Sequence, residues 1–241
     1  MAFLKTERAL PNLRLCGNPL PWTDKCKHLG TTITSKIDGC EEDMKIKNAM
    51  YVKKNLELNQ EFHFAHPTTK LKINNIYNSH YSSSPLWNLF GHGAQKLESS
   101  YNRSIKIMLG LPLQTHRYLI EPLTGEVHIK KVLLSRYLGF IEKIMSSGKQ
   151  AIKMLVETAK KDVRSVTGQN FRHIMLLLGK TSVEAVEKID VKEIEYFPIS
   201  KENSWKVDII KEIVEVKSTA IEIDNFEEEE LDNILLYLCT S

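Results

Sequence analysis

The segment EVHIKKVLLSRYLGFIEKIM, residues 126–145, carries the clearest structural signal in this chain of 241 residues. Its apolar residues follow i, i+3 and i, i+4 spacing, at Ile129, Leu133, Tyr137, Phe140, Ile141 and Ile144. Such spacing places apolar side chains on one face of an α-helix. We therefore predict an amphipathic helix over residues 126–145, which ends near residues 146–148.

Similar spacing extends outward from this segment in both directions. It predicts further helices over residues 41–60, 67–81, 94–109, 152–159, 171–178, 205–216 and 227–238. Pro67 fits the first turn of the second of these helices, because that position needs no backbone N–H. Gly110 and Pro112 end the third. The chain is therefore expected to be mainly α.

The first 40 residues have a different pattern. The first ~35 residues are expected to form β-structure, with a short run at Leu13–Cys16 and a strand at His28–Thr34, whose β-branched residues favour it. Turn sequences lie at residues 17–19 and 37–39. A small N-terminal β-element should therefore precede the helices. The division that we expect has three parts, namely residues 1–40, 41–114 and 115–241. A softer boundary lies near residue 180, where the charge changes sign.

The net charge of +3 hides an uneven distribution. Net charges are +6, +7 and −10 over residues 1–114, 115–180 and 181–241. A basic body favours a polyanionic partner, and the acidic end would point elsewhere or shield the basic surface when nothing is bound. Basic balances of this size also occur on solvated surfaces without a partner, so charge alone leaves both interpretations open.

The sequence lacks the motifs that mark several classes of protein. It has no run of about 18 apolar residues and no apolar signal-peptide core in residues 1–11. It also lacks a phosphate-binding glycine loop and the common hydrolase and metalloprotease motifs. A zinc site can be drawn from Cys16, Cys26, His28 and Cys40, but no CxxC pair anchors it. We therefore expect an intracellular protein of the nucleus or cytoplasm, without catalytic residues, metal ligands, a small-molecule substrate or a membrane partner.

Cations and aromatic residues recur together along the predicted helices. The residues that stand out are Lys47, Tyr51, Lys54, Arg103, Lys106, His116 and Arg117. Lys47 and Lys54 share one helix face because they are seven residues apart, and Tyr51 lies between them. Cations can meet phosphates while an aromatic ring stacks on a base, so nucleic-acid binding is one interpretation. An ordinary exposed face of lysine and tyrosine is the other.

An ordered set of short motifs accompanies these residues. They are Leu20-Pro21-Trp22, Lys27-His28-Leu29-Gly30, 43–49 (DMKIKNA), 77–80 (YNSH), 84–87 (SPLW), 100–105 (SYNRSI), 111–112 (LP), 115–117 (THR), 120–122 (IEP), 162–170 (DVRSVTGQN) and 234–240 (ILLYLCT). In this order they resemble the end of the palm, the thumb and the C-terminal region of reverse transcriptases from non-LTR (LINE-type) retrotransposons. Tyr101 stands where that family usually has Trp.

The resemblance implies a function. The thumb of such an RNA-directed DNA polymerase clamps an RNA template–primer or RNA–DNA duplex, and a hairpin called the primer grip supports the primer end. It therefore implies nucleic-acid contacts at Lys27, His28 and Gly30, in addition to the cationic and aromatic residues named above. Polymerisation needs aspartates that hold two Mg²⁺ ions, and this sequence has no two adjacent aspartates. We expect a non-catalytic fragment without a cofactor, whose fingers, most of the palm and endonuclease domain would precede Met1.

Two other hypotheses stand beside this one. The chain can be a non-catalytic helical protein-interaction module, in which the acidic end with Trp205 contacts a protein. It can also be an inert product of a degenerate mobile element. Salt-sensitive binding of nucleic acid would separate the first hypothesis from both.

Overall fold

The fold is mainly helical, with small antiparallel strand pairs ahead of the helices, as the sequence predicts. The computed structural model describes residues 14–19, 23–34, 40–77, 81–125, 128–177, 204–219 and 225–240. The helices are α1 (Glu41–Glu61), α2 (Pro67–Tyr77), α3 (His92–Met108), α4 (Ile120–Thr124), α5 (Ile129–Ser146), α6 (Gln150–Lys161), α7 (Val166–Leu177), α9 (Ser204–Thr219) and α10 (Asn225–Thr240). Single 3-10 turns lie at Ser84–Leu86 and Arg117–Leu119. Residues 20–22 and 78–80, which carry part of the resemblance, lie outside the described residues.

The N-terminal β-structure consists of two hairpins. Strands β1 (Arg14–Leu15) and β2 (Asn18–Pro19) form one, and β3 (Lys25–His28) and β4 (Thr31–Thr34) form the other. The prediction of a single strand over residues 28–34 is wrong. Leu29 and Gly30 form a two-residue turn between β3 and β4, with φ angles of 47° and 78°. Positive φ at both central residues matches the twist of a two-residue hairpin, and a glycine there costs little.

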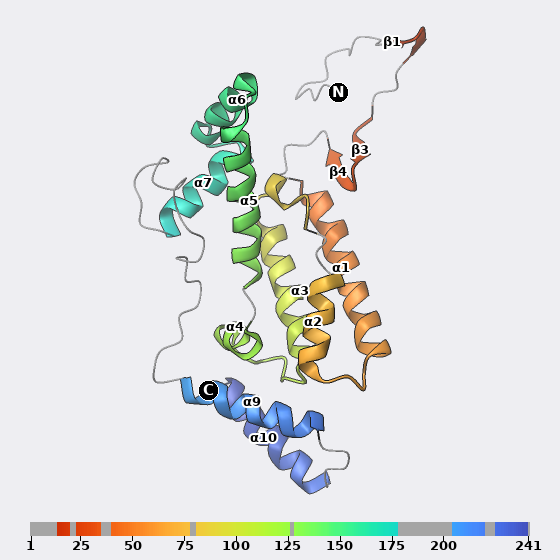
Figure 1. Cartoon of the computed structure of the whole chain (residues 1–241), viewed down its shortest axis with the longest axis vertical. Coiled ribbons are helices and arrows are strands. Elements are labelled where there is room, and N and C mark those ends of the chain that lie inside the picture. The colour runs from red at the N-terminus through yellow and green to blue at the C-terminus, as the bar shows by residue number, and fades with distance from the viewer. Residues whose placement is uncertain are drawn as a thin grey trace.

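Three helices and the long fifth helix form the body of the molecule. Figure 1 shows α1, α2 and α3 side by side, with α5 along the opposite side of α3. Side chains from all of these helices share one apolar core, which includes Met44, Tyr51, Leu97, Ile105 and Tyr137. The core continues from α3 into α5, across the predicted boundary near residue 114.

The last two described helices form a hairpin across one end of the body (Figure 1). Helix α9 packs against α10 and α4, and Ile210 and Leu235 are buried in this packing. The backbone N–H of His116 donates to the carbonyl oxygen of Cys239 at 2.9 Å, so the C-terminal end of α10 is attached to the loop after α3.

A buried carboxylate ties the β-hairpin to the helices. Asp43, in the first turn of α1, is 0% exposed. Its Oδ1 accepts from the backbone N–H of Thr32 at 2.8 Å. Its Oδ2 accepts from Ser83 Oγ at 2.6 Å and from Trp87 Nε1 at 3.0 Å. Buried charge is tolerated when several donors compensate it, so this one side chain joins β4, α1 and the loop before α3.

A buried amide on α7 binds the loop before α3 from its other side. Asn170, on α7, is 0% exposed. Its Oδ1 accepts from the N–H of Leu89 at 3.0 Å, and its Nδ2 donates to the carbonyl oxygen of Trp87 at 2.9 Å. Beside it, Asn88 Nδ2 donates to Gln169 Oε1 at 2.9 Å. The end of the 162–170 motif therefore holds the segment after the SPLW motif.

The rest of the 162–170 motif makes the turn between α6 and α7. Asp162 Oδ1 accepts from the N–H of Arg164 at 2.9 Å. Ser165 caps α7, because its Oγ accepts from the N–H of Gly168 at 2.9 Å and donates back to the carbonyl of Asp162. A Cβ at Gly168 would overlap the carbonyl oxygen of Asp162. Glycine is therefore required here by close approach of two backbones.

Candidate nucleic-acid interface

A basic cleft lies where α3 meets the loop that follows it. Its volume is about 330 Å³, and its lining residues are Ser99, Asn102, Arg103, Lys106, Leu113 and Arg117. The α3 residues recur at spacings of three and four, so they share one face of the helix. The cleft therefore brings together three of the predicted nucleic-acid-binding residues, Arg103, Lys106 and Arg117.

The local backbone explains how the loop reaches this face. Gly110 has a φ of +66°, the left-handed conformation that commonly ends a helix, and the N–H of Leu111 donates to the carbonyl of Lys106 at 2.8 Å. The ammonium group of Lys106 in turn donates to the carbonyl oxygen of Leu113 at 2.7 Å. These contacts fold the loop back, and Arg117 comes to lie opposite the basic face of α3.

The three cations differ in their surroundings. Arg103 is exposed, and among the described residues no carboxylate lies within ion-pair distance of it or of Lys106. Burial, together with the nearby charge of Arg117, lowers the pKa of Lys106 from its ordinary value. Arg117 is exposed, and its Nη1 lies 3.9 Å from Glu98 Oε1. An anion entering the cleft would therefore meet at least two cations that no described acid neutralises.

Behind Arg117, a buried charge cluster fixes the wall of the cleft to α5. The side chain of Glu98 is 3% exposed; its Oε2 lies 2.9 Å from Lys130 Nζ, and its Oε1 lies 3.5 Å from His128 Nε2. His128 also caps α5, because its Nδ1 accepts from the N–H of Lys130 at 3.3 Å. Burial lowers the pKa of His128, while the charge of Glu98 acts in the opposite direction. The cluster therefore connects α3, which carries Glu98, to α5, and Glu98 also lies close to the guanidinium of Arg117.

The most unusual group in the cleft is the amide of Asn102. The residue is 4% exposed, and neither its Oδ1 nor its Nδ2 has a hydrogen-bond partner within the described part of the chain. A buried polar group without a partner costs about 1–3 kcal/mol. Such a group in a basic cleft suits a ligand that can both accept and donate a hydrogen bond.

The structure corrects the expected role of Tyr51. Its residue exposure is 1%, and its ring lies 5.9 Å from the ring of Tyr101 in the core. The expectation of a ring at the surface between Lys47 and Lys54 is wrong, because the apolar face of α1 packs on α3 and Tyr51 lies on that face. Lys47 and Lys54 are half-buried on α1 and do not line the cleft.

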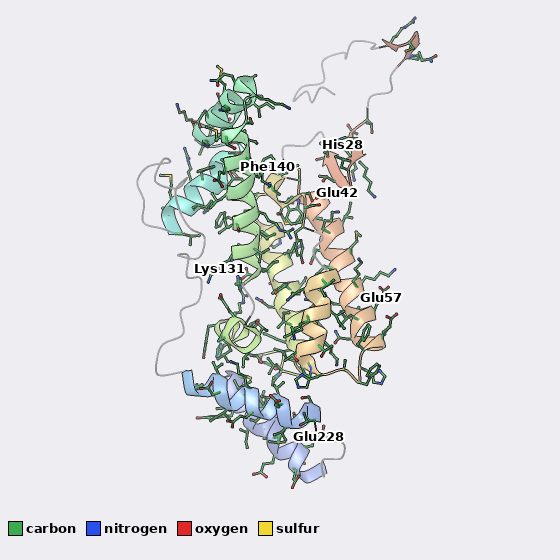
Figure 2. The ribbon with its side chains drawn as sticks, viewed as in Figure 1. His28, Glu42, Glu57, Lys131, Phe140 and Glu228 are labelled. Atoms are coloured by element: carbon green, nitrogen blue, oxygen red, sulfur yellow. The ribbon has the colours of Figure 1, made fainter. Side chains whose placement is uncertain are left out.

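The remaining predicted residues also lie apart from the cleft. Figure 2 places His28 on the β3–β4 hairpin above the first turns of α1. Lys27 and Gly30 belong to the same hairpin and are exposed. His116 lies beside the cleft, but its Nε2 is 3.0 Å from the carbonyl oxygen of Thr240, and its ring stacks on Tyr118. His116 therefore attaches α10 to the body.

The acidic run does not cover the cleft in this structure. Glu227–Glu230 occupy the first turns of α10, whereas the last turn, with Cys239, contacts His116. The rise of an α-helix separates Glu228 from Cys239 by roughly 16 Å. Figure 2 shows Glu228 at the end of α10 that lies away from the junction with the loop.

Sequence reasoning did not select Asn102 or Leu113. Asn102 lies between Tyr101 and Arg103, so its place beside a basic residue is visible in the sequence. Its amide has no hydrogen-bond partner because of the way α3 packs in three dimensions, and a local sequence pattern does not show this packing. Leu113 contributes a backbone carbonyl, which any residue type would provide.

Among the described residues, no group of three or more histidine, cysteine, aspartate or glutamate side chains is arranged to hold a metal ion. None of the described helices has the length and apolar content needed to cross a membrane. Comparisons with protein-family models, with curated proteins and with solved structures find no match for this chain.

Proposed function

We propose that the chain binds nucleic acid through its phosphate backbone, as the thumb-like part of a reverse transcriptase of the non-LTR type. The observation that supports this most is the cleft on α3, where Arg103, Lys106 and Arg117 surround the buried amide of Asn102. In a complete enzyme this surface would hold an RNA–DNA template–primer, and the hairpin with Lys27, His28 and Gly30 would support the primer end.

The chemistry of the cleft suits phosphates better than an acidic protein surface. Two arginines present planar arrays of donors that match phosphate oxygens, and the lysine adds a compact charge. Contacts of this kind carry no sequence information, so the binding should be independent of sequence. It should also weaken as salt rises, with a slope of about −0.7 to −0.9 in log–log form for each phosphate contacted.

The test is the affinity of the full chain for a short RNA–DNA duplex, measured by fluorescence anisotropy as the salt concentration is raised. Arg103→Glu should lower the affinity by about tenfold at low salt and reduce the magnitude of the salt slope by about 1. Arg172→Glu makes the same change of charge at an exposed residue of α7, outside the cleft, and should change the affinity little.

Two results would contradict the proposal. One is the absence of salt-sensitive binding by the unmodified chain. The other is an equal loss of affinity in Arg103→Glu and Arg172→Glu, which would indicate attraction by total charge and no specific surface. Either result would move the interpretation toward a helical protein-interaction module or an inert product.

A further inference from the structure

We infer that the cleft distinguishes ribose from deoxyribose, with the amide of Asn102 hydrogen-bonded to a 2′-hydroxyl group while the surrounding cations hold the adjacent phosphate. This inference rests on the proposed function and adds a specificity determinant to it, namely a contact between Asn102 and the ribose of the RNA strand. It starts from the two unpaired atoms of one buried side chain.

The unpaired atoms have opposite requirements. Asn102 Nδ2 needs an acceptor, which a phosphate oxygen supplies, but Oδ1 needs a donor, which a phosphodiester does not have. None of the cations of the cleft donates to Oδ1: Lys106 donates to Leu113, Arg117 faces Glu98, and Arg103 makes no hydrogen bond to it. A ligand made of phosphate alone would therefore leave Oδ1 buried and unpaired.

A ribose hydroxyl next to a phosphate meets both requirements. The 2′-hydroxyl is a donor and an acceptor, and it is the group by which proteins tell RNA from DNA. In an RNA strand it neighbours the 3′-oxygen, so it lies beside the phosphate that joins the nucleotide to the next one. Arg103 and Arg117 stand on the two sides of the cleft, on α3 and on the following 3-10 turn, and Asn102 lies on α3 next to Arg103. The cleft thus offers charge for the phosphate and an amide for the hydroxyl at neighbouring positions.

The arrangement also explains why the amide remains unpaired within the chain. Asn102 lies one turn of α3 from Lys106 and one turn from Glu98, and both of these charged groups are engaged elsewhere. Neither of them donates to Oδ1, so this atom stays buried without a partner within the chain. A partner from outside the chain can satisfy both atoms, and the cost is then recovered on binding.

The experiment compares four duplexes of the same sequence: an RNA–DNA hybrid, a DNA duplex, an RNA duplex, and a hybrid whose RNA strand carries 2′-O-methyl groups. The 2′-O-methyl strand cannot donate from the 2′ position, but it retains the RNA-like helix, so it separates the hydroxyl from helix shape. Affinities are measured at one salt concentration for the unmodified chain, for Asn102→Leu and for Arg103→Glu.

The unmodified chain should bind the two duplexes with free 2′-hydroxyls about five- to tenfold more tightly than the other two, the effect of about one hydrogen bond. Asn102→Leu should remove this preference, so that the variant binds all four duplexes with similar affinity. Leucine has the same branching and the same number of side-chain heavy atoms as asparagine, and it removes two unpaired buried polar atoms. A melting temperature equal to or above that of the unmodified chain therefore verifies that the variant folds.

The outcomes separate this inference from the proposed function. Equal affinity for all four duplexes, with a loss of binding in Arg103→Glu, would overturn the inference and keep the proposed function. A preference for both RNA-like hybrids, including the methylated one, would mean that helix shape is recognised, and would overturn the inference as well. If Asn102→Leu weakens every duplex equally, the amide contacts phosphate and not ribose. No binding of any duplex would contradict the proposed function itself.

Discussion

Two asparagines of this chain are buried almost equally but differ completely in hydrogen bonding. Asn170 is 0% exposed, and both polar atoms of its amide are bonded to the backbone of the loop before α3. Asn102 is 4% exposed, and its amide atoms have no partner in the described residues. The first amide is bonded within the fold, whereas the second is bonded to nothing in the described part of the chain. Burial alone therefore does not show whether a polar side chain is paired within the fold.

The charged groups near these two asparagines, at the loop before α3 and in the cleft, show the same contrast. Next to the β3–β4 hairpin, the carboxylate of Asp43 accepts hydrogen bonds from three donors, which belong to Thr32, Ser83 and Trp87. In the cleft, Arg103 has no acidic partner among the described residues. The first region is electrostatically complete within the chain, whereas the proposed function has an anion complete the second.

The largest effect is expected from Asp43→Ala. It leaves the buried donors of Ser83 and Trp87 without an acceptor, and it releases β4 from α1. We expect a loss of about 3–5 kcal/mol in the free energy of unfolding, measured by urea denaturation. Asp232→Ala, which removes an exposed partner of Lys217, should cost less than about 1 kcal/mol. A loss at Asp43 as small as that at Asp232 would contradict the structural role of the carboxylate.

The two asparagines should respond oppositely to one substitution. Asn170→Leu breaks two buried hydrogen bonds and leaves the N–H of Leu89 and the carbonyl of Trp87 unpaired, so it should cost about 2–4 kcal/mol. Asn102→Leu breaks no described hydrogen bond and should be neutral or stabilising by about 1 kcal/mol. Thermal melts of both variants test this difference in sign. Equal destabilisation would mean that Asn102 is also a structural residue.

Glycine substitutions test the packing of the 162–170 turn. Gly168→Ala should lower the free energy of unfolding by about 1–3 kcal/mol, because its Cβ would overlap the carbonyl of Asp162. Gly139 offers a matched control, because it lies within α5 with no atom near its Cβ position. Gly139→Ala should raise the free energy of unfolding by about 0.4–1 kcal/mol. Similar values for both variants would show that the turn is not closely packed.

The smallest effect concerns pH and the cluster behind the cleft. Burial lowers the pKa of His128, so the unfolded chain binds a proton near pH 6.5 that the folded chain does not. Stability should therefore fall as the pH drops from about 6.5 toward the lowered pKa, by at most about 1.4 kcal/mol per pH unit. His128→Asn retains a capping group and should show a weaker dependence in this range. A dependence identical to that of the unmodified chain would contradict a buried, neutral His128.

Much of the fold follows from sequence periodicity. The helix predicted over residues 126–145 corresponds to α5, and the helix predicted over residues 41–60 corresponds closely to α1. Helix α5 is long and amphipathic, so local spacing predicts it. Helix α1 is long, and the three acidic residues of its first turn mark where it begins. The prediction of a strand over residues 28–34 was wrong because the number of β-branched residues does not reveal the turn at Leu29, whose φ is positive.

The cleft was only partly predictable. Arg103, Lys106 and Arg117 stand out as cations, but a loop reversal at Gly110 brings Arg117 opposite the other two. Tyr51 looked equally suitable, and its burial follows from the packing of α1 on α3. Whether the amide of Asn102 has a hydrogen-bond partner depends on all the side chains around it in the folded chain, so only the structure shows that it has none among the described residues.

The most direct test is to locate the nucleic acid on the protein. An RNA strand carrying 4-thiouridine is hybridised to DNA, bound to the full chain and irradiated, and the crosslinked peptides are identified by mass spectrometry. The account predicts crosslinks within residues 99–117, which Arg103→Glu strongly reduces and Arg172→Glu leaves unchanged. Crosslinks confined to α6 and α7 or to α9 and α10, or crosslinks that Arg103→Glu leaves unchanged, would contradict it.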